Sequence, residues 1–184
     1  MKVRSTTFYI CFLAVGLSYS SCNQSSKQDQ NSLLPDTTGT NATEKEILLK
    51  DYGAEPTVLD IDAYTMSNTN FRTTLWTGGK LQVTLMSIPT GGEVGLEQHP
   101  DTDQFLRIED GSARVMIGSH KDSLDFVKTA EKDFAIFIPA GKWHNIVNSG
   151  DRPLKIYSVY SPAEHPHGTI HKTKKDADEA EFHH

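Results

Sequence analysis

The chain has 184 residues, with 18 basic and 24 acidic side chains and a formal net charge of −6 at pH 7. Proteins that bind nucleic acid usually carry clusters of Lys and Arg, so this acidic balance excludes nucleic acid as an expected partner. The length suits one domain with tails, and a hydrophobic content of 36% is sufficient for a single core.

Residues 1–21 have the features of a secretory signal. Lys2 and Arg4 precede an apolar run over residues 8–17, and small or polar residues follow ahead of Cys22. The run is too short to span a bilayer, which takes about 20 residues. The segment resembles a bacterial lipoprotein signal, in which Cys22 becomes the lipidated first residue of the mature chain. The alternative is an ordinary secreted protein with an unrelated cysteine.

Residues 22–55 are expected to form a flexible tether behind the lipidated Cys22. The first part is rich in Asn, Gln, Ser and Thr, a composition that cannot bury enough surface to order itself, and a short helix is expected over residues 44–50. Cys11 would leave with the signal and Cys22 would be acylated, so no intrachain disulfide is expected. A lipid anchor would hold the exported domain at the cell envelope, on the periplasmic or outer-surface side of a membrane.

Residues 56–164 carry many short apolar runs that are separated by Gly, Pro and Asp. Such punctuation is typical of an all-β barrel or sandwich. Beside the strands that flank residues 97–104, strands are expected over residues 71–76, 80–87, 111–117, 123–128, 133–138, 143–147 and 154–160.

Two segments of this domain carry side chains of the metal-ligating kind, residues 91–104 and 139–148. Residues two apart in a strand point to the same side, so Glu97 and His99 present a carboxylate and an imidazole together. Gln104 opens the next strand and can bring its amide oxygen back toward this pair, while His144 opens a strand after a Pro-Ala-Gly turn. We predict that these four residues form one metal site; the alternative is a solvated polar loop.

In order and spacing, the two segments resemble the two sequence motifs of the cupin superfamily. In the first motif Glu97 occupies the first His position, His99 occupies the second, and Gln104 stands where the family has Glu. In the second motif Asp133 replaces the opening Gly, and four further signature residues are in place: Pro139, Gly141, His144 and Asn148. The resemblance implies a single jelly-roll-like β-barrel that holds one divalent cation, with Fe, Mn, Zn and Ni not distinguished.

The resemblance also implies two kinds of chemistry on a small molecule, dioxygenase-like or sugar isomerase-like, with Glu97 as a ligand and potential proton acceptor. No separate general base stands out in either motif, so a non-catalytic metal-binding or ligand-sensing module is the second hypothesis. A third is a structural barrel with a vestigial site. Cupins often pair, which makes a homodimer a further expectation.

We also predict where several side chains outside the two motifs lie. An apolar wall around the ion is expected from Leu81, Val83, Leu85, Phe105, Ile138, Ile146 and Tyr157, although each of these alone is expected simply to pack in the core. Residues 161–171 resemble a cover strand over the barrel mouth, and residues 165–184 are expected as a His-containing segment with a short helix beyond the barrel. Its histidines, His165, His167 and His171, are expected as surface imidazoles, with substrate contact or a second ion site as the alternative, and residues 173–182 as an exposed helix.

Overall fold

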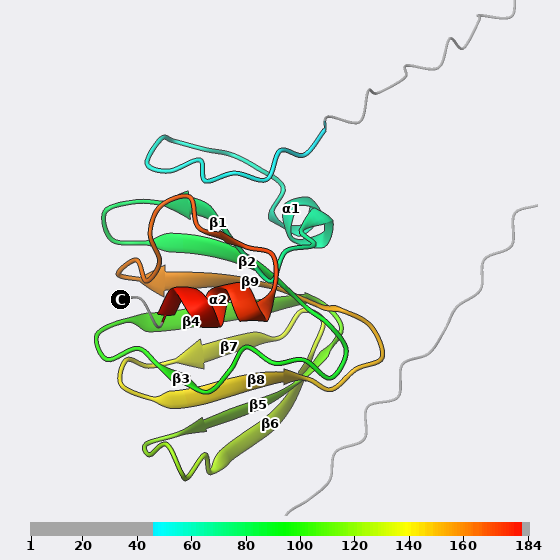
Figure 1. Ribbon diagram of the computed structural model, residues 1–184, viewed down its shortest axis with the longest axis vertical. Coiled ribbons are helices and arrows are strands. Elements are labelled where there is room, and N and C mark those ends of the chain that lie inside the picture. Colours follow the sequence, from blue (N-terminus) through cyan, green and yellow to red (C-terminus); the bar gives the residue numbers. More distant parts are fainter. Residues whose placement is uncertain (1–45, 182–184) are drawn as a thin grey trace, which may run out of the picture. The chain divides into compact units, whose positions relative to one another are not determined.

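The computed structural model describes residues 46–181, which form ten strands and two helices. One sheet contains β1 (Arg72–Thr77), β2 (Gln82–Ile88), β4 (Asp103–Asp110), β7 (Ala135–Ile138), β9 (Leu154–Ser161) and β10 (Ile170–His171). The other sheet contains β3 (Glu97–Gln98), β5 (Ser112–Gly118), β6 (Phe126–Glu131) and β8 (Trp143–Asn148). The strand orders are β10-β1-β2-β9-β4-β7 and β3-β8-β5-β6, with antiparallel pairing throughout (Figure 1). The expected all-β, jelly-roll-like fold is confirmed.

The strands form where buried and exposed side chains alternate along the sequence. In β9, Leu154, Ile156, Ser158 and Tyr160 are buried and the residues between them are partly exposed. This period of two is the pattern of a strand with one face on the core. The expected strand over residues 123–128 begins too early, because His120 and Ser123 pair in a tight turn and β6 starts only at Phe126.

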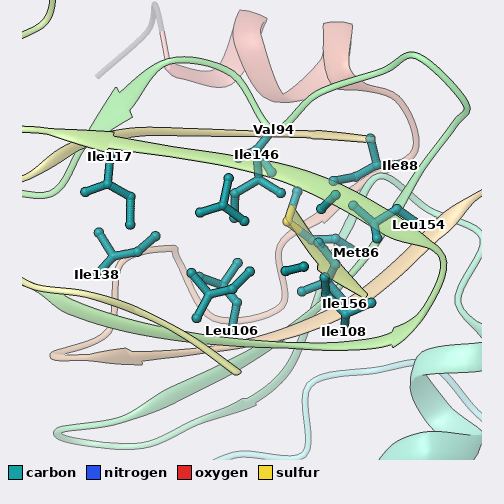
Figure 2. Packing of buried hydrophobic residues seen from close by; sticks show 14 of the residues in the cluster. Met86, Ile88, Val94, Leu106, Ile108, Ile117, Ile138, Ile146, Leu154 and Ile156 are labelled. Carbon is teal, nitrogen blue, oxygen red and sulfur yellow. The ribbon is translucent and has the colours of Figure 1, made fainter. Parts of the chain in front are cut away.

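The core lies between the two sheets (Figure 2). Met86, Leu106 and Ile156 contribute from the six-stranded sheet, and Val115 and Ile146 contribute from the four-stranded sheet. All five are at most 2% exposed. Burial of side chains of this size stabilises the folded state by about 1.5–3 kcal/mol each, so the core holds the two sheets face to face.

The apolar wall that we expected around the ion is confirmed only in part. Ile138 and Ile146 are buried in the core between the sheets. Leu85 is also buried, but it shares the outer face of β2 with Val83 and is outside the core cluster. Leu81 is 39% exposed, and Val83 is only partly buried beside it, so neither belongs to an interior wall. Phe105 and Tyr157 point away from the core, where their ring centroids lie 6.1 Å apart. The prediction for Tyr157 was wrong, because Tyr157 lies on the outer face of β9, between the inward-facing residues Ile156 and Ser158.

Two helices flank the sheets. Helix α1 (Ile61–Ser67) was not predicted; it begins at Asp60, whose side chain accepts a hydrogen bond from the Ala63 backbone, and it contacts β2, β4 and β9. The helix expected over residues 44–50 is absent from its described part, residues 46–50. None of the helices within residues 46–181 is long and apolar enough to cross a bilayer. The predicted signal segment and Cys22 lie outside the described residues.

Helix α2 (Lys174–Glu181) confirms the helix that was expected near the C-terminus, but not its full exposure (Figure 1). Thr173 and Asp176 cap its first turn reciprocally, each side chain bonded to the other residue's backbone N–H. Ala177 is 2% exposed and belongs to the core cluster. Together with Lys174, Ala177 lines a small pocket against residues 94–97. The helix is therefore docked on the domain through one face.

Asp133 shows why a non-glycine residue is tolerated at a position where the motif has Gly. Its φ is 71°, in the left-handed region that favours Gly and that Asp enters more readily than most residues. Its carboxylate accepts a hydrogen bond from Arg107 over 2.6 Å. This exposed pair fixes the turn into β7.

Truncation of the core should cost far more stability than truncation of the outer face. Ile156→Ala, at a site that is 0% exposed, is expected to lower the free energy of unfolding by about 2–5 kcal/mol. Leu81→Ala, at 39% exposure, should change it by less than about 1 kcal/mol. Urea titration of both variants measures the difference, and equal losses would contradict the placement of the core.

Candidate metal centre

The two motif segments meet at the pairing of β3 with β8. In this antiparallel register Glu97 lies directly opposite His144. Residues opposite each other in adjacent strands have Cβ atoms about 4.5–5.5 Å apart, so their side chains meet on one face. His99 follows β3 directly, two residues beyond Glu97, and returns to the same side.

Hydrogen bonds from the backbone and from two side chains hold the turn before β8 against the end of β3. The Gly141 N–H donates to the His99 carbonyl over 2.8 Å, and the Gln98 amide donates to the Gly141 carbonyl over 2.8 Å. Gly141 has a φ of 76°, which Gly adopts without steric cost. Asp103 accepts a further bond from the Ala140 N–H. These bonds fix His99 and His144 relative to each other.

Three of the four predicted ligands come together. One ligand atom from each of Glu97, His99 and His144 lies within 4.8 Å of the other two. The Glu97 Oε1 atom is 3.2 Å from His144 Nε2 and 3.4 Å from His99 Nε2. His99 and His144 are 7% and 1% exposed, so the group is shielded from water.

The other nitrogen of each imidazole is held by an acceptor. His144 Nδ1 lies 3.0 Å from the Lys142 carbonyl oxygen, and His99 Nδ1 lies 3.0 Å from Glu164 Oε1. Because a carbonyl or carboxylate oxygen only accepts, each Nδ1 carries the hydrogen, and in a neutral ring the Nε2 lone pair then faces Glu97. Metal-ligating histidines are oriented in this way by carboxylate or carbonyl partners.

Gln104 is 3% exposed, and its amide is fixed at one end. The Nε2 group donates to the Tyr160 hydroxyl over 3.0 Å, and the β4–β9 register places these two residues opposite each other. The Oε1 atom is buried and has no hydrogen-bond partner among the described residues. A cation would satisfy an oxygen of this kind, and the place of Gln104 as the fourth ligand remains a prediction.

The Glu97 carboxylate carries the negative charge that faces both imidazoles. Burial alone would raise its pKa, but hydrogen bonding with His144 and His99 and the positive charge of Arg72 outweigh burial and hold the pKa well below its usual range. The Arg72 Nη2 atom is 3.9 Å from Glu97 Oε2. Burial opposes the charge of His99, yet hydrogen bonds to Glu164 and Glu97 raise its pKa to about 9. In the metal-free protein the protonated His99 ring therefore supplies, next to Glu97, the positive charge that a bound cation would supply.

A cavity of about 520 Å³ opens beside this cluster. Its lining includes Glu97 and His99 together with Arg72, Gln98, Glu164, His165, Pro166, Thr169, His171 and Ala180. The volume lies within the range of about 300–1,000 Å³ that is typical of small-molecule sites. The lining residues from Glu164 onward follow β9, so the part of the chain after β9 forms part of the cavity wall.

Sequence reasoning missed several of these residues. His165 and His171 were expected at the surface, but both line the cavity and each has a buried ring nitrogen. The His167 side chain is 58% exposed, as expected. Glu164 could have been proposed from an acidic residue beside a histidine in the segment expected to cover the barrel. The alternation of buried residues along β9 would have selected Tyr160 in place of Tyr157.

The two facing antiparallel sheets and the His–Glu cluster define a single-domain jelly-roll protein with a candidate metal centre. The family model "Cupin domain" matches residues 84–160. The uncharacterized protein YrkC of Bacillus subtilis (strain 168) is 53% identical over 138 residues, which cover 75% of this chain and 74% of YrkC. The chain therefore belongs to the cupin superfamily, as the motif spacing predicted.

Two further proteins are similar to this chain. The uncharacterized protein L612 of Acanthamoeba polyphaga mimivirus is 39% identical over 114 residues, which cover 61% of this chain and 69% of L612. The crystal structure of BH2720 from Bacillus halodurans superposes with a TM-score of 0.70 at 52% identity, and the match covers 71% of this chain and 98% of BH2720.

Glu164 should control the proton affinity of His99. In the metal-free protein, Glu164→Gln removes the carboxylate that lies 3.0 Å from His99 Nδ1, so the pKa of His99 should fall from about 9. Titration of the imidazole by NMR measures this change. Glu179→Gln, at an exposed position on α2, is the matched control. A His99 pKa that stays near 9 without Glu164 would contradict the assigned contact.

The same interaction predicts how stability depends on pH. The pKa of His99 rises from 6.5 to about 9 on folding, so the folded state binds an additional proton between these values. Its stabilisation is complete below the lower value and is lost as pH rises through the upper one, by up to about 3 kcal/mol. Urea unfolding of the metal-free protein across this window should show the loss, and Glu164→Gln should flatten it. A constant or rising stability would be inconsistent with a cationic His99.

Proposed function

We propose that the protein binds one divalent cation through Glu97, His99 and His144, with the Gln104 amide oxygen as a fourth ligand, and acts on a small molecule in the adjoining cavity. One observation carries the proposal: both imidazoles have Nδ1 fixed by an acceptor and Nε2 directed at the same Glu97 oxygen. Two nitrogen and two oxygen donors suit Fe, Mn, Zn or Ni.

The protein's own groups have separate tasks in this site. A bound divalent ion would supply Lewis acidity toward an oxygen of the small molecule. Glu97 stays ionised, Glu164 and the Lys142 carbonyl hold the two rings, and Tyr160 holds the Gln104 amide. Burial raises the pKa of Tyr160 above its usual value, so its hydroxyl keeps its proton. The ligand geometry is therefore set before an ion arrives.

Metal-assisted chemistry on a small oxygen-containing molecule, dioxygenase-like or sugar isomerase-like, is the reaction class that we infer. It is supported by the buried donor set and by the cavity beside it. A non-catalytic binding or sensing module is the second candidate, and two observations favour it. The hydrogen bond from His99 lowers the pKa of Glu164, and burial lowers the pKa of His165 to about 3, so neither is tuned for proton transfer near neutral pH.

We further propose that the domain is exported and anchored at the cell envelope through Cys22. This proposal is supported by the sequence alone: the basic start, the short apolar run and the small residues before Cys22. Pairing of two copies is proposed through the edge strands β6 and β7, where Phe126 and Phe137 are 51% and 70% exposed.

Loss of a ligand should remove the metal without unfolding the domain. Elemental analysis of the purified protein is expected to give about one divalent ion per chain, and Glu97→Gln and His144→Gln should reduce this to background, since each removes a donor from the small set that coordinates the ion. His120→Gln, at an exposed hairpin position, should retain the metal.

The same preparations separate the alternatives. Turnover of enolisable acids or sugars, followed by oxygen uptake and product analysis, would identify an enzyme, whereas bound metal without turnover would favour the binding module. Full metal content in both ligand variants would refute the donor set. A wild-type protein that takes up no metal after reconstitution would refute the proposed function.

A further inference from the structure

The cavity is also lined by nitrogen-bearing side chains that are not proposed as metal ligands. Arg72 on β1 is 1% exposed, and the β1–β10 register places it directly opposite His171. His165 enters from the loop before β10, with its ring edge-on to Tyr160 at a centroid distance of 5.2 Å. Three nitrogen-bearing groups from separate segments thus line one side of the cavity.

Two of these groups have unsatisfied nitrogens. His165 Nε2 and His171 Nδ1 are buried, and neither has a hydrogen-bond partner among the described residues. A buried polar atom without a partner is unfavourable, and native proteins rarely keep one without a reason. Both residues line the same cavity as Arg72, so a ligand that accepts hydrogen bonds would satisfy them together.

We propose that Arg72, His165 and His171 form a subsite for the carboxylate of a small organic acid, which approaches the metal centre with its remaining oxygen atoms. This inference rests on the proposed function, because it assigns the substrate class of the same site. The charge of Arg72 attracts a carboxylate, and each of the two imidazoles can donate one hydrogen bond to it.

The charges around the cavity favour a monoanion. Arg72 carries one positive charge and Glu97 and Glu164 carry one negative charge each, so a divalent ion leaves one net positive charge. One carboxylate neutralises it. A phosphate dianion would bring excess negative charge close to Glu97, whose Oε2 lies 3.9 Å from Arg72 Nη2. The subsite therefore suits a carboxylate better than a phosphate.

The proximity of Arg72 to Glu97 also indicates where a second oxygen atom of the acid would lie. A carboxylate on Arg72 lies next to a proposed metal ligand, so a second oxygen on the adjacent carbon would face the ion. The substrate class that we infer is therefore a 2-oxo or 2-hydroxy acid. Such an acid would contact Arg72 and the metal ion at the same time.

Isothermal titration with pyruvate as the probe tests the subsite, with the full chain in metal-loaded and metal-free forms. Pyruvate should bind, more tightly to the metal-loaded form, while methyl pyruvate and inorganic phosphate should bind at least about tenfold more weakly. Arg72→Gln and the double variant His165→Phe/His171→Phe should each weaken pyruvate binding by about 10- to 100-fold.

Matched controls separate the subsite from general effects. Arg152→Gln and His167→Gln alter an exposed arginine and an exposed histidine, and both should bind pyruvate as the wild type does. Arg72→Gln alters a buried residue, so circular dichroism and metal content are measured for each variant, and the histidine double variant stands as an independent test.

The outcomes distinguish the subsite from the metal centre. Loss of pyruvate binding with metal content retained supports the subsite. Absence of pyruvate binding in both forms, equal binding of the methyl ester, preferred binding of phosphate, or unchanged affinity in the folded variants would overturn it. If the wild type takes up no metal, the proposed function fails, whereas binding to the metal-free chain that depends on Arg72 and the two histidines would still uphold a carboxylate subsite.

Discussion

The ionised Glu97 carboxylate, half-buried between two imidazoles and a guanidinium, makes the interactions on which the rest of the site depends. Burial opposes its charge, and only nearby donors and positive charges make the ionised form stable there. Those partners come from both sheets, with His144 on β8 and Arg72 on β1. The fold must therefore be complete before the ionised carboxylate is stable. A bound cation would stabilise the Glu97 charge in the same way as the proton on His99 does in the metal-free protein.

The C-terminal segment completes both the fold and the site. Glu164 fixes the ring of His99, β10 places His171 opposite Arg72, and α2 buries Ala177 in the core. Without these residues the cavity would lose one wall and the His99 ring would lose its orienting carboxylate. The segment thus links packing at the sheet edge to the chemistry of the centre, and its order is expected to matter for ligand binding as much as for stability.

Spacing within strands predicted much of the site, because it is a local property. Glu97, His99 and His144 were found from two-residue periodicity and motif order, and the strands that carry them lie where alternation places them. Glu164 and Arg72 were missed because their roles arise from pairings between segments distant in the chain. Tyr157 was chosen in place of Tyr160 because the sequence did not show which set of alternating residues in this strand faces the core. A shift of one residue in that assignment moves every side chain to the opposite face.

Anomalous scattering from a crystal of the metal-loaded protein tests the central claim most directly. The donor set predicts one ion about 2.0–2.2 Å from a Glu97 carboxylate oxygen and from Nε2 of both His99 and His144. The Gln104 amide oxygen should be directed at the same ion. An ion bound elsewhere, or imidazoles that turn Nδ1 toward it, would contradict a centre organised around the Glu97 carboxylate.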